Sequence, residues 1–385
     1  MRTSLGELAR LFAKLGTIAF GGPAAHIAMM EDEVVVRRKW LTREAFIDLL
    51  GATNLIPGPN STELAIHIGH ARAGWAGLVV AGVSFILPAA LIVTVIAWAY
   101  VRFGALPAAA GILYGVKPVV IAVVLQALWR LGRSAIKNTW LAIVGGAAVI
   151  AILIGVNELI VLAAGGVVAA IPRWRGGSDV RRALLPSSLV STGHSLASAG
   201  AAGVVGSASA VALWPLFGVF FKIGAVLFGS GYVLLAFMRA DFVERLHWLT
   251  ERQLLDAVAV GQITPGPVFT TATFVGYVLA GGSGAALATL GIFLPAFIFV
   301  AISGPLVPKL RRSPLAGAVL DGVNVVSLAL MAVVTAQLAK AALIDPPAIA
   351  IAAASALVLF RYRTNSAWLV IGGAVIGLVL VIARV

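Results

Sequence analysis

Long apolar stretches, separated by short polar segments or by glycine and proline, dominate this chain. Those apolar enough for buried or membrane-spanning helices lie at 75–101, 108–131, 139–156, 158–171, 283–303, 314–338, 346–361 and 366–383. A helix that crosses a bilayer needs about 20 apolar residues, so the shorter stretches are expected to tilt or to re-enter. Divided into such spans, the chain has room for about ten membrane segments, so the sequence predicts an all-α polytopic membrane protein with discontinuous helices.

The second half of the chain repeats the first. A shift without gaps places residues 14–62 on residues 222–270 with sixteen identities, including the WLT run, and after one deletion the register continues through Pro88 and Pro295. Chance matching of apolar runs does not conserve such residue types, so the pattern indicates a duplication. The expected units are a first transmembrane repeat, 1–172, and a second, 213–385. Residues 173–212, rich in Arg, Ser, Ala and Gly, are expected to form a flexible linker.

The cations between the apolar runs alternate oppositely in the two halves. The positions compared are Arg130, Arg133 and Lys137 against Lys340, and Lys309, Arg311 and Arg312 against Arg102. By the positive-inside rule, the two repeats are expected to be inverted relative to each other. Inverted repeats are typical of secondary transporters. The same rule leaves the sidedness of the termini open, because the linker and the N-terminal cations point to different answers.

Composition agrees with a lipid environment. Hydrophobic residues make up 61% of the chain and charged residues 11%, against about 25% charged residues in soluble domains. The net charge of +13 comes from cations scattered at the ends of apolar runs, which favours cytoplasmic loops over a nucleic-acid surface. With no cysteine, the chain has no disulfide framework and no thiolate nucleophile. The N-terminus lacks a signal-peptide cleavage site and is expected to stay on the protein.

Glycine and proline interrupt the apolar pattern at two corresponding places in each repeat. The interruptions are Gly21, Gly22 and Pro23 with Pro57, Gly58 and Pro59, and Gly229, Ser230 and Gly231 with Pro265, Gly266 and Pro267. A broken helix leaves N–H groups without partners, and the next helix begins with a positive dipole end, which suits a small oxyanion. Paired interruptions predict a transport site, although glycine and proline also kink tightly packed membrane helices.

Polar side chains that could complete such a site lie beside the interruptions. They are Asn54, Asn60, Ser61, Thr62, Thr264, Thr270 and Thr271. Lys14 and Lys222 occupy the same repeat position in an apolar context, where an ionisable group is costly and therefore a candidate for balancing substrate charge. Either lysine could instead reach the headgroups along its aliphatic stem.

Glu63, His67 and His70 are spaced so that a helix beginning at Asn60 would place all three on one face. Glu63 with His67 is interpreted as a proton-titrating pair. A metal site and a satisfied cluster at a loop edge remain the alternatives.

Acidic and basic residues alternate after the first interruption. They are Glu31, Asp32 and Glu33 before Arg37, Arg38 and Lys39, with a thinner second-half version in Arg239, Asp241, Glu244 and Arg245. The pattern favours a salt-bridged interfacial elbow, with a gate as the alternative. Four polar residues inside apolar runs either line the pathway or cap helices: Lys117, Gln126, Asp321 and Asn324.

The runs FGGPAAHIAMMEDEVV, WLT and NLIPGPNSTE, with degenerate FGSG and TPGP copies, resemble the chromate ion transporter family over nearly the whole chain. The resemblance implies export of chromate from the cytoplasm across the cytoplasmic (inner) membrane, driven by the proton motive force, with sulfate as competitor or alternative. The family motif falls on Gly21, Gly22, Pro23, His26, Glu31, Trp40, Asn54, Pro57, Gly58, Pro59, Asn60, Ser61, Thr62 and Glu63. The second half departs from it at Ser230, Gly231, Leu234 and Val268, so an unequal contribution of the halves is expected.

The sequence therefore predicts a secondary active transporter that works by alternating access between inverted repeats. Protons would be coupled, or access gated, by His26, Glu31, Glu33, Glu63, His67 and Asp241. The expected partners are an oxyanion, protons and the bilayer, with no cofactor and no nucleic acid, and a homodimer is allowed. A passive oxyanion channel is one alternative. The other is a membrane enzyme acting on a lipid-linked anion, which the missing nucleophile constellation disfavours.

Overall fold

The computed structural model describes residues 3–19, 22–104, 106–176, 212–228, 233–303, 313–362 and 366–383. Several predicted features lie outside these residues: Gly21, Gly229, Ser230 and Gly231, the cations Lys309, Arg311 and Arg312, and all but the ends of the linker 173–212. Within the described residues the regular structure is helical throughout.

Each repeat contains a series of short helices followed by long ones. The first has α1 (Leu5–Ile18), α2 (Pro23–Glu31), the π-helix η1 (Asp32–Arg37), α3 (Arg43–Thr53), α4 (Asn60–Phe103), α5 (Pro107–Ala135), α6 (Thr139–Leu153) and α7 (Glu158–Gly176). The second has α8 (Leu213–Val226), α9 (Leu234–Met238), η3 (Arg239–Arg245), α10 (Glu251–Ile263), η4 (Val268–Thr270), α11 (Thr271–Ser303), α13 (Pro314–Ala342), α14 (Pro346–Tyr362) and α15 (Ser366–Ile382). The apolar stretches predicted from the sequence all lie in helices, and two of them, 75–101 and 283–303, cover only the later parts of α4 and α11.

Several helices begin at residues whose side chains cap them. Thr42 accepts a hydrogen bond from the amide of Ala45, and Asn138 accepts one from the amide of Leu141. Thr250 and Gln253 form a complete capping box at the start of α10. These caps satisfy amides that the helix itself leaves without partners.

The long helices α4 and α11 are each a helical hairpin. Ala73 and Gly74 leave the helical conformation, with φ of 63° at Gly74, and Ala280 and Gly281 do the same at the corresponding place. A Cβ at Gly69 would collide with the carbonyl oxygen of Gly77, although residues eight apart in a continuous helix are separated by about 12 Å. Each chain segment therefore folds back at its tip, with a short first arm and a long second arm.

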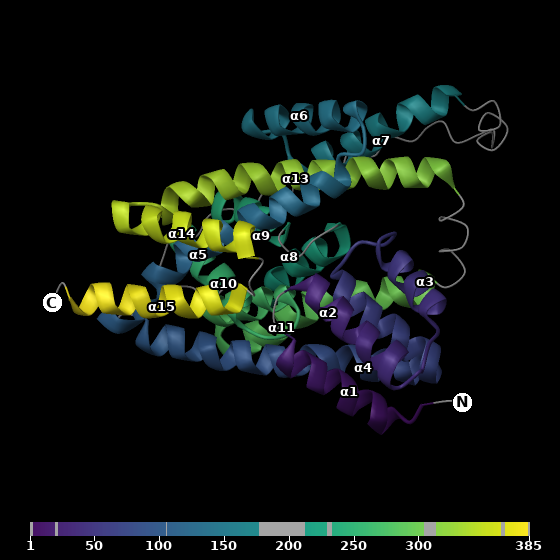
Figure 1. Ribbon diagram of the computed structural model, residues 1–385, viewed down its shortest axis with the longest axis horizontal. Coiled ribbons are helices and arrows are strands. Elements are labelled where there is room, and N and C mark those ends of the chain that lie inside the picture. The colour runs from purple at the N-terminus through teal and green to yellow at the C-terminus, as the bar shows by residue number, and fades with distance from the viewer. Residues whose placement is uncertain are drawn as a thin grey trace.

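The two repeats interlock. Helices α14 and α15 of the second repeat pack on α5 of the first, and α6 and α7 of the first pack on α13 of the second. Glycines allow the close approach, because a Cβ at Gly115 would collide with the carbonyl of Gly373, and one at Gly322 would lie 2.5 Å from that of Gly165. Figure 1 shows α6 and α7 beside α13 at one edge of the molecule, and α1 beside α4 at the opposite edge.

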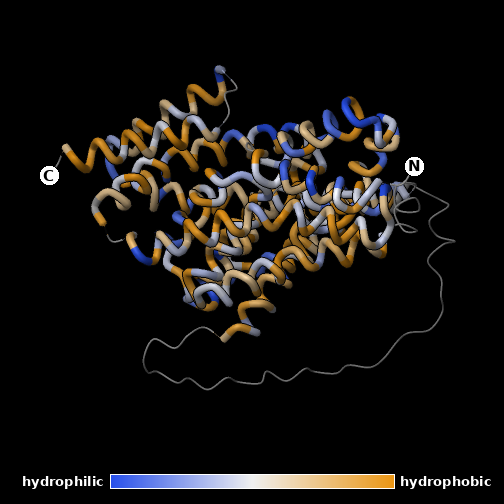
Figure 2. The backbone as a smooth tube through the Cα atoms, turned by 90° about the horizontal axis from the view of Figure 1, so that it is seen from below, coloured by the Kyte–Doolittle hydropathy of each residue, from blue (hydrophilic) through white to orange (hydrophobic). Residues whose placement is uncertain are grey.

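Apolar side chains cover much of the outer surface. Leu87, Leu91, Val95 and Trp98 recur along the second arm of α4 and are all at least half exposed, Leu87 at 51% and Val95 at 63%. In the part of the chain that the structure describes, four helices are long and apolar enough to cross a membrane, α4, α5, α11 and α13, and five shorter helices are also apolar. Figure 2 shows hydrophobic positions along the helices and hydrophilic ones gathered at turns and helix ends, most visibly near the N-terminus. This is the surface of a multi-pass membrane protein.

Candidate functional site

Each Pro-Gly-Pro interruption contacts the residue that ends the first helix of the other repeat, just before its glycine interruption. The amide of Gly58 donates a hydrogen bond to the carbonyl of Leu227, 2.8 Å away, and the amide of Gly266 donates one to the carbonyl of Ala19 at 3.0 Å. Ala19 and Leu227 are equivalent repeat positions, each directly before an FG dipeptide. The two Pro-Gly-Pro interruptions therefore form two junctions, and each junction contains residues of both repeats.

Both junctions require glycine. Gly58 has φ of 138°, and an added Cβ would collide with Oε1 of Glu63. Gly266 has φ of 86°, and its Cβ would lie 2.6 Å from Cβ of Ala89 and 2.9 Å from the carbonyl of Gly16. Positive φ and close approach both exclude larger residues at these two positions.

His26 connects the two junctions. Its Nε2 lies 3.0 Å from the carbonyl oxygen of Ala19, and its Nδ1 lies 3.2 Å from the hydroxyl of Ser61. Because a carbonyl only accepts, Nε2 carries the proton of the neutral ring and the Ser61 hydroxyl donates to Nδ1. The contacts from Gly266 through Ala19 and His26 to Ser61 place both Pro-Gly-Pro interruptions in one neighbourhood.

Glu63 lies fully buried in the first turn of α4, beside Gly58. Among the described residues neither of its carboxylate oxygens has a hydrogen-bond partner, and the same is true of the Thr62 hydroxyl and of Nε2 of His67. Buried polar groups are normally paired, so these three side chains mark the first part of α4 as a candidate site. No cation neutralises this carboxylate through a salt bridge within the described part of the chain.

The three residues of the predicted group, Glu63, His67 and His70, differ in burial. Glu63 and His67 are buried, with His67 at 7% exposure, whereas His70 is exposed and its ring contacts that of Trp75. His70 lies one turn after His67 and close to the hairpin tip at Ala73 and Gly74, where its side chain is no longer covered by other helices. Within the described ranges, no three histidine or acidic side chains are arranged to hold a metal ion.

The second repeat contributes different chemistry. Measured from the hairpin tips, Gly69 corresponds to Gly276, so Glu63 and His67 correspond to Thr270 and Phe274, one residue earlier than the ungapped shift predicts. The second repeat is one residue shorter here, and its helix α11 is preceded by the 3₁₀ turn η4. The hydroxyls of Thr264, Thr270 and Thr271 all donate to backbone carbonyls, so their protons are engaged within the protein.

The other predicted polar residues lie around the first junction. Gly22, with φ of 78°, precedes α2, which begins at Pro23. Asn60 begins α4, and its side-chain amide donates to Oδ1 of Asn54 at 3.0 Å. That bond ties the end of α3 to the start of α4 across Pro57, Gly58 and Pro59 and fixes the direction in which the α4 amides point.

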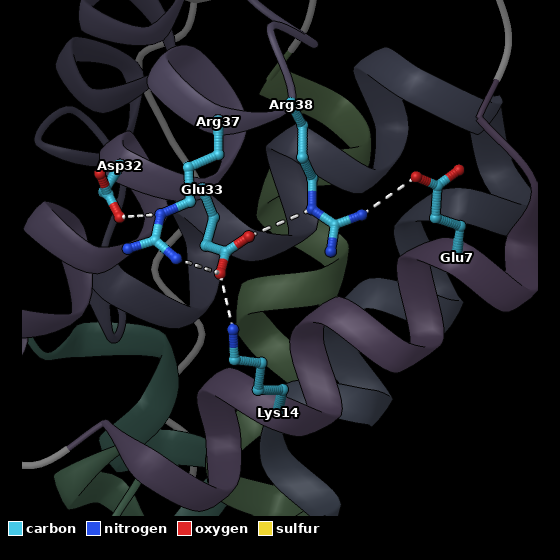
Figure 3. A network of polar contacts seen from close by, with 6 residues as sticks. All are labelled: Glu7, Lys14, Asp32, Glu33, Arg37 and Arg38. Carbon is cyan, nitrogen blue, oxygen red and sulfur yellow. Dashed lines mark hydrogen bonds and ion pairs between the residues drawn. The ribbon is translucent and has the colours of Figure 1, made fainter.

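The predicted elbow is confirmed as a salt-bridged network, drawn in Figure 3. The Lys14 ammonium lies 2.7 Å from the buried Glu33 carboxylate, which also contacts Arg38 at 3.2 Å and Arg37 at 4.0 Å. The hydrogen bond from Lys14 holds the pKa of Glu33 below its usual value, with a further contribution from Arg38, while burial acts in the opposite direction. Glu31 lies at the edge of this network and contacts Arg43 at 3.6 Å.

The second repeat reproduces the central ion pair. Lys222 lies 2.6 Å from the buried Asp241, which Arg245 also contacts at 2.7 Å. Lys14 and Lys222 occupy equivalent positions, as do Glu33 and Asp241, so each repeat ties its first helix to its π-helix in the same way. Both lysines, expected to contact the substrate, are paired with carboxylates in this structure.

A buried ion pair between the repeats was not predicted. Lys117 on α5 lies 2.8 Å from Asp256 on α10, and the hydroxyl of Tyr100 donates to the other carboxylate oxygen at 2.9 Å. Asp256 is 2% exposed and Lys117 is 9% exposed. The available signal was that both are ionisable residues within apolar runs, which in membranes implies a partner.

Interlocking repeats, helical hairpins and paired helix breaks near buried polar groups fit a membrane transporter of the inverted-repeat class. The sequence profile described as "Chromate transporter" matches residues 6–170 and 214–378, and the chain belongs to that family.

Curated relatives agree with this assignment over most of their length. The "Chromate transport protein" of Cupriavidus metallidurans is 34% identical over 388 residues, covering 98% of this chain and 93% of the relative. The "Chromate transport protein" of Pseudomonas aeruginosa is 32% identical over 343 residues, covering 88% of this chain and 82% of the relative. No solved structure matches the fold.

Proposed function

We propose that this chain exports chromate from the cytoplasm across the cytoplasmic membrane, driven by the proton motive force, by alternating access between its two repeats. Family membership and the names of the relatives support chromate as the substrate. Sulfate, a tetrahedral dianion of similar shape, is the expected competitor.

The observation that carries the proposal is the buried Glu63 without a hydrogen-bond partner, next to two Pro-Gly-Pro junctions that both repeats build together. The amides of Asn60 and Ser61 lie at the start of α4, where a helix offers N–H groups and a positive dipole end to an anion. A titratable carboxylate at the same place is a group through which transport can be coupled to protons. The matched ion pairs Lys14–Glu33 and Lys222–Asp241 are placed to act as gates of the two repeats.

Flux of labelled chromate in vesicles tests this directly. Proteoliposomes should take up chromate faster than protein-free vesicles, with saturation and competition by sulfate, and an imposed pH gradient should change the rate. Asn60→Ala, which removes the bond to Asn54, should reduce the rate strongly, whereas Asn157→Ala at the start of α7, remote from the junctions, should not. Uptake equal to that of empty vesicles would refute the proposal, and flux that follows membrane potential alone would indicate a channel.

A further inference from the structure

The position of Glu63 determines which way protons and oxyanion are coupled. Its carboxylate lies against Gly58 at the start of α4, the place where the broken helix offers its amides to an anion. Two anionic groups held close together in a medium of low dielectric repel each other strongly. An ionised Glu63 and a bound oxyanion therefore exclude each other, whereas a protonated Glu63 is neutral and gains an O–H donor.

No neighbouring cation removes this conflict. Lys14 is engaged by Glu33, and Lys117 by Asp256. The titratable and charged groups on the elements that pack against α4 are Glu7, Arg10 and Lys14 on α1, His26 and Glu31 on α2, Arg43, Glu44 and Asp48 on α3, Glu251, Arg252 and Asp256 on α10, and Tyr277 on α11. Within the described residues, none of them is bonded to the Glu63 carboxylate.

Two histidines, His67 and His70, lie along the first arm of α4 between Glu63 and the hairpin tip. Along the first arm of α4, the exposed fraction of the side chain rises from 0% at Glu63 to 7% at His67, and His70 is exposed. Two residues further on, Arg72 donates to the carbonyl of Trp40 at 2.7 Å and stacks on its ring, which places the tip beside the charged elbow. Tryptophan and arginine together mark a membrane interface.

The dimensions of the arm agree with a path from the interface to the membrane centre. Nine residues separate Glu63 from Arg72, which is about 13 Å along a helix axis. Half of the hydrocarbon core is about 15 Å. His67 and His70 divide this distance at one-turn spacing, and histidine is the side chain best suited to relay protons near neutral pH.

We infer that Glu63 takes up a proton, delivered through His70 and His67, before an oxyanion binds at the start of α4, so that proton and oxyanion move across the membrane in the same direction. This inference rests on the proposed function. One proton carried with a dianion leaves one net negative charge to move. The membrane potential, which is negative inside, is then the component of the proton motive force that drives export, and the pH gradient opposes it.

The test measures chromate and proton movement together in proteoliposomes with the membrane potential clamped. Alkaline buffers on both sides keep chromate a dianion, and a trapped pH indicator reports the lumen. Wild-type protein should take up chromate several-fold faster when the outside is the more acidic side, and the lumen should acidify as chromate enters. The ratio of protons to chromate should fall to background in Glu63→Gln and stay at the wild-type value in Glu158→Gln, a remote control on α7.

The possible results separate the inference from the proposed function. Chromate uptake that makes the lumen more alkaline, or that runs faster when the inside is the more acidic, overturns the inference but leaves a chromate transporter. A ratio of protons to chromate in Glu63→Gln that equals the wild-type ratio also overturns the inference. If that variant carries no chromate flux, the direction of proton movement in the wild type alone decides. His67→Gln and His70→Gln should slow the gradient-driven phase several-fold, and unchanged rates in both refute the relay. Absence of any protein-dependent flux refutes the proposed function and the inference together.

Discussion

The amide of Gly58 in the first repeat donates a hydrogen bond to the carbonyl of Leu227 in the second, and the amide of Gly266 makes the equivalent bond to Ala19. The helix break of each repeat is thus completed by the other repeat. Through His26, which contacts both Ala19 and Ser61, the two breaks belong to one polar region. An oxyanion bound there would contact both repeats, as alternating access between them requires.

Gly58→Ala should reduce chromate transport by more than about tenfold, because a non-glycine residue at positive φ costs about 1–2 kcal/mol before any collision is counted. The added methyl group would also displace the Glu63 carboxylate. Initial rates in proteoliposomes, corrected for the amount of reconstituted protein, measure the effect. Gly146→Ala in α6, where a Cβ meets open space, is the matched control, and equal rates for the two variants would contradict this account of the junction.

The hairpin arms should be equally sensitive in both repeats. Gly69→Ala and Gly276→Ala each place a Cβ against the opposite arm, and overpacking of this kind costs about 1–3 kcal/mol. Both variants should lower the melting temperature of the detergent-solubilised protein by similar amounts. Gly282→Ala, also in the α11 hairpin but with open space around the added methyl, should melt like the wild type. A lowered melting temperature in only one repeat would argue against equivalent hairpins.

The buried pair Lys117–Asp256 should matter more than an exposed one. Asp256→Asn leaves a buried ammonium without its counter-ion, which costs about 3–5 kcal/mol, and the variant should give little folded protein. The double variant Lys117→Met/Asp256→Asn should recover most of it. Asp321→Asn, which breaks the pair with the 59% exposed Lys137, should cost at most about 1 kcal/mol. Size-exclusion profiles and thermal melts distinguish these outcomes, and equal losses from the two single variants would contradict the argument.

Acid should weaken the elbow through Glu33. Lys14 and Arg38 lower the pKa of Glu33 in the folded protein, so the pair contributes its full stability above the unfolded-state pKa of about 4.3. This contribution is lost as the pH falls through the lower, folded-state pKa. The melting temperature should therefore fall more steeply in this acidic range for the wild type than for Glu33→Gln. Glu44→Gln, an exposed residue of α3, should behave like the wild type, and a Glu33→Gln profile parallel to the wild type would count against the pair.

The fold followed closely from the sequence, because the apolar runs and the repeat are strong one-dimensional signals. The helix start at Asn60 and the salt-bridged elbow were also predictable, since charge and spacing act over a few residues. The hairpin tips were not predicted. The apolar runs begin just after them, at 75 and 283, but only the positive φ of Gly74 and Gly281 shows that the chain reverses there.

Contacts between the repeats could not be predicted from the sequence alone. Lys117 and Asp256 lie in different repeats, and no local pattern indicates that α5 and α10 meet. The exposure of His70 depends on where the hairpin turns, which the helical spacing of the residues does not reveal. Of the candidate site, the residue types could be predicted, whereas their partners depended on the way in which the repeats interlock.

The number of oxyanions bound per chain tests the shared site most directly. Equilibrium dialysis of the purified protein with labelled chromate, with and without excess sulfate, measures this number for the wild type, Gly58→Ala and Gly266→Ala. One shared site predicts one chromate per chain, displaced by sulfate, and loss of that binding in each of the two variants. Two chromates per chain, with each variant removing only one of them, would contradict the account.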